Sequence, residues 1–108
     1  MDGTDIHVHT MIIALDFDNT WTADKELWNW FYTAASKKGH IVIMATMRSG
    51  HSEDMDRYDL PPDMPIVYCG MEYKQHACLD AGFEVDVWVD DMPMLISPGL
   101  IIGSDEEL

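Results

Sequence analysis

Residues 11–20 read MIIALDFDNT, an apolar run that ends in two aspartates separated by one residue. An uninterrupted apolar run is typical of a strand that is buried on both faces, as in a parallel sheet. Carboxylates at the end of such a strand lose hydration unless a cation or a ligand compensates them. Asp16 and Asp18 therefore indicate a site, and strand-like spacing predicts that both side chains point to the same face.

Similar apolar runs recur along the chain, with helical segments between them. Further strands are expected at 41–45, 66–68, 85–89 and 100–102. One helix is expected from Ala23 or Asp24 to about Lys38, and a second from about Tyr73 to Ala81, each followed by a glycine that can end it. Five strands that alternate with helices predict an α/β fold with a parallel sheet.

Three more polar signals follow or neighbour these runs. Thr46 follows the run at 41–45, Lys74 stands at the start of the second expected helix, and Asp90 and Asp91 follow the run at 85–89. Ligands of open parallel sheets bind beyond the carboxyl ends of the strands. These side chains are therefore expected to share one crevice with Asp18.

Taken in order, Asp-x-Asp-x-Thr, a strand-end Thr, a Lys and a strand-end Asp-Asp resemble the four motifs of the haloacid dehalogenase superfamily of phosphohydrolases. The resemblance extends over residues 11–102. It implies a three-layer α/β/α sandwich around a five-stranded parallel Rossmann-like sheet, in the strand order 3-2-1-4-5. Asn19 stands where this family most often has glycine, and Trp21 where a smaller aliphatic residue is common.

The resemblance also assigns chemistry to the motifs. Asp16 would attack phosphorus and form an aspartyl-phosphate, while Asp18 would act as general acid and then as general base toward water. Thr46 and Lys74 would bind the phosphoryl oxygens. Arg48 either contacts a second anionic group of the substrate or is a surface residue.

The cofactor implied by the same resemblance is Mg²⁺, which prefers hard oxygen ligands. Asp16, the main-chain carbonyl of Asp18 and Asp90 are its expected ligands, with Asp91 close by or acting through water. Either member of the Asp90-Asp91 pair could be the direct ligand.

The segment between 46 and 66 is too short for a large cap domain, which implies a capless member with an open site. Such a site suits a nucleotide, a small phosphomonoester or a phosphorylated macromolecule. Another subunit could also cover it, in a homo-oligomer. The alternative to an enzyme is a non-catalytic Mg²⁺-binding or phospho-accepting regulatory module like a receiver domain, although receivers carry their adjacent acids after the first strand. Catalytic release of phosphate, rather than its retention, distinguishes the two.

The composition limits the partners. The 108 residues have room for one domain at 11–108, preceded by a flexible leader or tag at 1–10. The formal net charge of −14 disfavours stable nonspecific binding to nucleic acid and attraction to anionic membranes. No apolar run approaches the roughly 18 residues of a membrane span.

The cysteines and tryptophans are expected to be structural. Cys69 and Cys78 belong to no metal-binding spacing and are read as reduced, mostly buried thiols, which with the missing signal peptide favours a cytoplasmic protein. The tryptophans are expected to pack in the core or under a loop rather than to stack on bases. They stand at 21, 28, 30 and 88.

Overall fold

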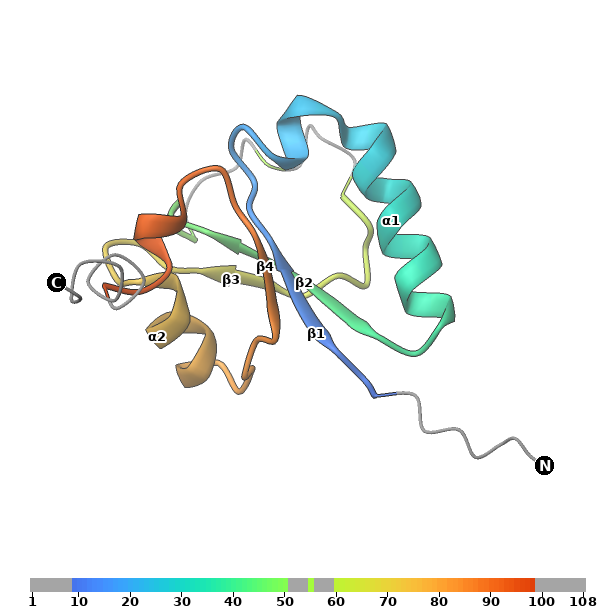
Figure 1. Ribbon diagram of the computed structural model, residues 1–108. Coiled ribbons are helices and arrows are strands. Elements are labelled where there is room, and N and C mark those ends of the chain that lie inside the picture. The colour runs from blue at the N-terminus through green and yellow to red at the C-terminus, as the bar shows by residue number, and fades with distance from the viewer. Residues whose placement is uncertain (1–8, 51–54, 56–59, 99–108) are drawn as a thin grey trace, which may run out of the picture.

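The computed structural model describes residues 9–50, 55 and 60–98. In this part of the chain it shows an α/β fold with a parallel four-stranded sheet in the order β3-β2-β1-β4 (Figure 1). The strands are β1 (Ile12–Leu15), β2 (Ile41–Thr46), β3 (Ile66–Tyr68) and β4 (Val87–Val89). The predicted α/β class and the order of these four strands are confirmed. The expected fifth strand at 100–102 and the leader at 1–10 fall outside the described residues, apart from the exposed residues 9 and 10.

One helix covers each face of the sheet. Helix α1 (Lys25–Lys37) packs on one face and α2 (Lys74–Asp80) on the other (Figure 1). Side chains of the central strands point alternately into the core under α1 and the core under α2, so that every position of β1 after the first is buried. The face toward α1 holds Ile13, Leu15, Val42 and Met44, whereas the face toward α2 holds Ala14, Ile43, Ala45 and Val67. Burial on both faces explains why these strands are apolar without alternation.

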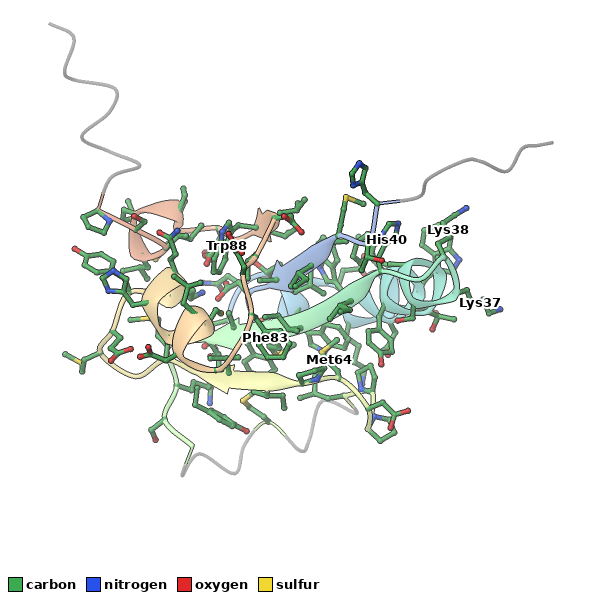
Figure 2. The ribbon with its side chains drawn as sticks, turned by 90° about the horizontal axis from the view of Figure 1, so that it is seen from below. Lys37, Lys38, His40, Met64, Phe83 and Trp88 are labelled. Carbon is green, nitrogen blue, oxygen red and sulfur yellow. The ribbon has the colours of Figure 1, made fainter. Side chains whose placement is uncertain are left out.

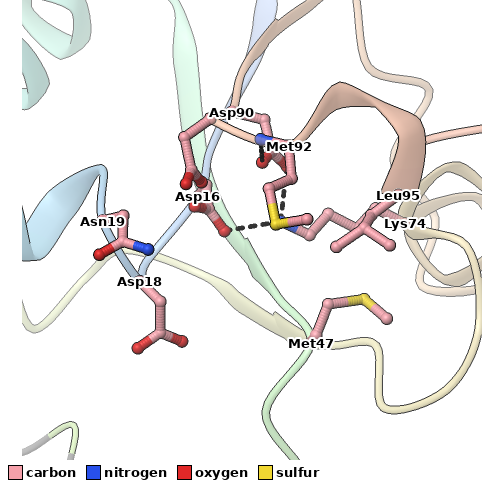
Figure 3. Close-up of a pocket in the computed structure, with 9 residues that line it drawn as sticks. Asp16, Asp18, Asn19, Met47, Lys74, Asp90, Met92 and Leu95 are labelled. Carbon is pink, nitrogen blue, oxygen red and sulfur yellow. Dashed lines mark hydrogen bonds and ion pairs between the residues drawn. The ribbon is translucent and has the colours of Figure 1, made fainter.

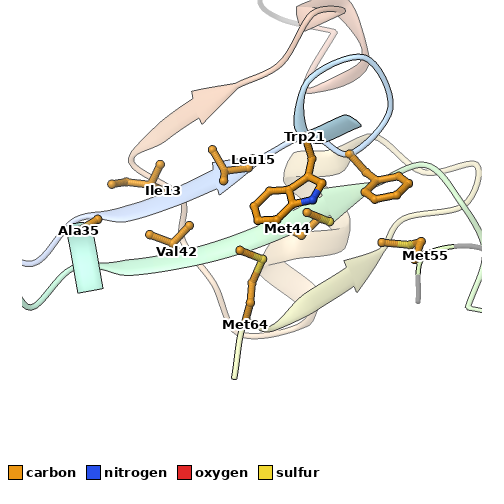
Figure 4. Close-up of a cluster of buried hydrophobic side chains, with 9 residues drawn as sticks. Ile13, Leu15, Trp21, Ala35, Val42, Met44, Met55 and Met64 are labelled. Carbon is orange, nitrogen blue, oxygen red and sulfur yellow. The ribbon is translucent and has the colours of Figure 1, made fainter. Parts of the chain in front are cut away.

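The core beneath α1 is closed by Trp21, whose side chain is fully buried next to Met44 (Figure 4). The expectation that the tryptophans pack in the core is confirmed for Trp21 and partly for Trp28 and Trp88, which are half-buried against the two cores. It is wrong for Trp30, which is 69% exposed. Helical periodicity explains the difference, because residues 28 and 30 lie on different sides of α1.

The helix ends follow from local chemistry. Asp24 caps α1, since its carboxylate accepts a hydrogen bond of 3.1 Å from the Leu27 N–H. Gly39, with φ of +93°, ends the same helix near Lys37 and Lys38, at the edge of the molecule away from α2 (Figure 2). Helix α2 ends one residue earlier than expected, and Gly82 follows it with φ of +96°.

Strand β4 begins two residues later than predicted, because Asp86 contacts β1 differently from a strand residue. Its N–H donates to the Ile12 carbonyl at 2.8 Å, but its own carboxylate accepts the Ile12 N–H at 2.8 Å in place of a main-chain carbonyl. Both cysteines are free and buried in the core under α2, as predicted. No helix within the described residues is long and apolar enough to cross a membrane.

Candidate active site

The carboxyl ends of β1 and β4 bring two of the predicted motifs together. The register pairs Leu15 with Val89, and the Asp16 N–H donates to the Val89 carbonyl at 2.9 Å, so Asp16 and Asp90 continue the two neighbouring strands. A pocket of about 200 Å³ opens here (Figure 3). It is lined by Asp16, Asp18, Asn19, Met47, Lys74, Asp90, Asp91, Met92 and Leu95.

Lys74 is the centre of the charged groups in this pocket. It begins α2 and is only 1% exposed, and its Nζ donates to Asp16 Oδ1 at 2.7 Å and to Asp90 Oδ2 at 2.6 Å. Burial by itself would lower the pKa of Lys74, but the hydrogen bonds to the two carboxylates, together with their charges, outweigh it and raise that pKa. Lys74 is therefore a buried lysine whose charged form is favoured by the two acids that it contacts.

Asp16 is a buried acid with an unusual affinity for protons. It is 7% exposed, and Thr20 Oγ1 donates to its Oδ2 at 3.2 Å. Burial raises the pKa of Asp16 to about 6; Lys74 opposes this rise, whereas Asp91 and Asp90 add to it. A second cation in the pocket would favour the ionised carboxylate that a nucleophile requires.

Asp16, Asp90 and Asp91 could hold that cation. Each offers a carboxylate oxygen, and these oxygens all lie within 4.8 Å of one another. Lys74 compensates only one of the three negative charges. Asp91 is exposed, which leaves room for water ligands on an ion such as Mg²⁺. The donor set and the charge balance thus fit a hard divalent cation.

The Asp18 carboxylate lies apart from these three acids. Strand β1 ends at Leu15 and residues 17–20 form a turn, so Asp18 no longer belongs to the strand, although Asp16 and Asp18 line the same pocket. Asp16 lies beside Asp90 and Lys74, whereas the Asp18 side chain points away from them (Figure 3). The turn depends on Asn19, whose φ of 69° is tolerated by asparagine and glycine.

Arg48 binds the Asp18 carboxylate with two nitrogen atoms. Its Nη2 lies 2.8 Å from Oδ1 and its Nε 3.1 Å from Oδ2. The guanidinium also lies over the ring of Phe17, 5.1 Å from its centroid. Of the two expectations for Arg48, a substrate contact or a surface position, neither included this pairing.

Thr46 ends β2 and is fully buried. Its hydroxyl oxygen accepts a hydrogen bond of 3.1 Å from the Arg48 N–H. The neighbouring Met47, rather than Thr46, lines the pocket. Among the expected residues, the structure thus brings together Asp16, Lys74, Asp90 and Asp91, with Asp18 at the rim and Thr46 beneath the loop that carries Arg48.

Apolar side chains around the pocket were not anticipated. Met47, Met92 and Leu95 form much of its wall. Met47 and Leu95 also border a second groove of about 330 Å³ with Met71 and Tyr73. The sequence did contain a signal for three of them. Met47 directly follows Thr46, Met92 directly follows Asp91, and Tyr73 directly precedes Lys74. Loops at this edge of a parallel sheet surround the ligand.

Comparisons of the chain with protein-family models, with curated proteins and with solved structures found no match.

Proposed function

We propose that the chain is a Mg²⁺-dependent phosphomonoester hydrolase of the haloacid dehalogenase type, which works through an aspartyl-phosphate on Asp16. The observation that carries the proposal is the buried Lys74, bonded to Asp16 at 2.7 Å and to Asp90 at 2.6 Å, with a third carboxylate from Asp91 in the same cluster. If Lys74 served only to stabilise the fold, the two acids that it contacts would be enough, and Asp91 would not be needed beside them. A site that transfers a phosphoryl group to a carboxylate needs that carboxylate beside groups that supply positive charge.

In the proposed reaction, an oxygen of Asp16 bonds to phosphorus as the bond from phosphorus to the ester oxygen breaks. Asp18 first takes up a proton from solvent on one oxygen, which gives up its contact with Arg48, and then passes this proton to the leaving oxygen. Water then attacks the aspartyl-phosphate, gives its proton to Asp18 and releases inorganic phosphate, which restores Asp16. Lys74 orients Asp16 and offsets the negative charge that develops on the phosphoryl oxygens.

Mg²⁺, when bound by Asp16, Asp90 and Asp91, would supply charge compensation for the nucleophile and the phosphoryl group. The main-chain carbonyl of Asp18 belongs to the proposed ligand set by resemblance. Thr46 belongs to the proposed phosphoryl-binding residues by resemblance; its hydroxyl oxygen accepts the Arg48 N–H, and it lies behind the pocket that Met47 lines.

The finer fold belongs to the same proposal: a capless three-layer sandwich whose fifth strand lies at 100–102. An open pocket lined by Met47, Met92 and Leu95 suits a phosphomonoester, a nucleotide or a phosphorylated macromolecule. Cover from a second copy and a cytoplasmic location are part of the proposal as well.

A phosphatase screen with Mg²⁺ or with a chelator tests this function. The panel includes an aryl phosphate, nucleotides, sugar phosphates, phosphopeptides and phosphorylated oligonucleotide ends. We expect Mg²⁺-dependent turnover that is abolished in Asp16→Asn and strongly reduced in Asp18→Asn. Asp80→Asn is the matched control, because it makes the same chemical change at an exposed position at the end of α2.

Full activity in Asp16→Asn would end the aspartyl-phosphate mechanism. Retention of phosphate on the protein without its release would indicate the non-catalytic phospho-accepting module instead.

A further inference from the structure

The contact between Arg48 and Asp18 is anchored at both ends. Arg48 stands two residues after the end of β2, and its main-chain N–H donates a hydrogen bond of 3.1 Å to the buried Thr46 hydroxyl oxygen, which fixes the main chain there. The guanidinium plane is supported by Phe17, which is fully buried. Asp18 is held by the turn at 17–20, where Trp21 and Thr22 donate to the carbonyls of Asp16 and Phe17.

Arg48 donates both hydrogen bonds of this pair, and Asp18 accepts both. Two nitrogens of Arg48 reach the two oxygens of Asp18, at 2.8 and 3.1 Å. A bidentate pair of this kind fixes the plane of the carboxylate as well as its position. Without it, the half-exposed side chain of Asp18 would be free to rotate, and the charges of Asp16 and Asp90 would repel it.

We propose that Arg48 is a positioning residue that sets the direction of the Asp18 carboxylate at the rim of the pocket, rather than a ligand for a second anionic group of the substrate. The inference rests on the proposed function, because it concerns the residue to which that function gives the proton transfers. It implies that an ester with a single phosphoryl group is a sufficient substrate.

A double-mutant cycle on kcat tests this role, with phenyl phosphate as the substrate. Arg48→Gln is expected to lower kcat about tenfold or more while KM changes less than about twofold, because Arg48 acts through Asp18 and not on the bound ester. In the Asp18→Asn background, the same Arg48→Gln change is expected to alter kcat less than about twofold.

Two further variants separate orientation from charge. Arg48→Lys keeps the charge but cannot form the two parallel hydrogen bonds, so we expect it to restore only part of the lost kcat. Lys38→Gln removes the same charge at the far end of α1 and is expected to leave kcat and KM unchanged. Urea unfolding midpoints close to wild type confirm that the variants are folded.

Three results would overturn the inference while leaving the proposed function intact. These are losses that multiply in the double variant, a large rise in KM for Arg48→Gln, or full kcat in that variant. Absence of Mg²⁺-dependent turnover of any ester by the wild-type protein would instead refute the proposed function, and the inference with it.

Discussion

Asp16→Asn is expected to produce an inactive protein that is more stable than the wild type. Asp16 is 7% exposed, and its pKa is raised from 3.8 to about 6, chiefly by burial. The folded state therefore binds a proton at Asp16 more tightly than the unfolded chain does. The cost to folding therefore builds up as the pH rises from 3.8, where the unfolded chain ionises, to about 6, and it is complete once the folded carboxyl is ionised as well.

The size of this cost follows from the pKa. Each pKa unit corresponds to about 1.4 kcal/mol, so ionised Asp16 destabilises the metal-free fold by about 3 kcal/mol at pH 8. At pH 5 the folded carboxyl is mostly protonated and the cost falls to about half that value. Asparagine has the shape of the acid without its charge, and should recover about these amounts.

Urea unfolding measures the gain, with tryptophan fluorescence, to which the buried Trp21 contributes, as the reporter. In chelator, Asp16→Asn should raise the free energy of unfolding by about 3 kcal/mol at pH 8 and by about half as much at pH 5. Added Mg²⁺ should stabilise the wild type and not the variant, which lacks a ligand. Asp80→Asn should change neither value.

A less stable Asp16→Asn variant at pH 8 would refute this reasoning. It would mean that the 2.7 Å contact with Lys74 outweighs the cost of burying Asp16. Equal gains at pH 8 and pH 5 would show that the effect is not due to ionisation of this group.

Three further predictions concern the other residues of the site. Lys74→Met leaves two buried acids without their cation, so it should lower the free energy of unfolding by about 3 kcal/mol at pH 8, and by less at pH 5, where Asp16 takes up a proton; an equal loss at both pH values, in urea unfolding, would contradict this. Calorimetry should show that the same variant binds Mg²⁺ more tightly than wild type, because one competing charge is gone; weaker binding would argue against the three-carboxylate site. Asn19→Gly should unfold at nearly the wild-type urea concentration, whereas Asn19→Val should cost about 1–2 kcal/mol because of its positive φ; equal stability of the two would count against the turn.

Much of the fold could be predicted because its signals are local. The apolar runs identified the strands, and Asp24, Gly39 and Gly82 marked the helix ends. Burial on both faces of β1 and β2 follows directly from their lack of alternation. The grouping of Asp16, Lys74 and Asp90 was also predictable, since parallel strands present their carboxyl ends at one edge.

The remaining features depend on contacts that sequence spacing does not contain. Asp18 was expected beside Asp16, but the turn after Leu15 directs it toward Arg48. Pairing between Asp18 and Arg48 links two loops 30 residues apart, and nothing in either loop specifies the partner. The exposed Trp30 shows likewise that an aromatic residue in a helix need not lie on its buried side.

Trapping of the proposed aspartyl-phosphate tests the central claim most directly. The protein is mixed with a substrate that it turns over and Mg²⁺, quenched, and treated with borohydride, which reduces an aspartyl-phosphate to homoserine; peptide mass spectrometry then locates the modified residue. The account predicts homoserine at position 16 in the wild type, and none in a sample prepared with chelator. Turnover without any modification of Asp16, or modification at Asp18 or Asp90 instead, would contradict it.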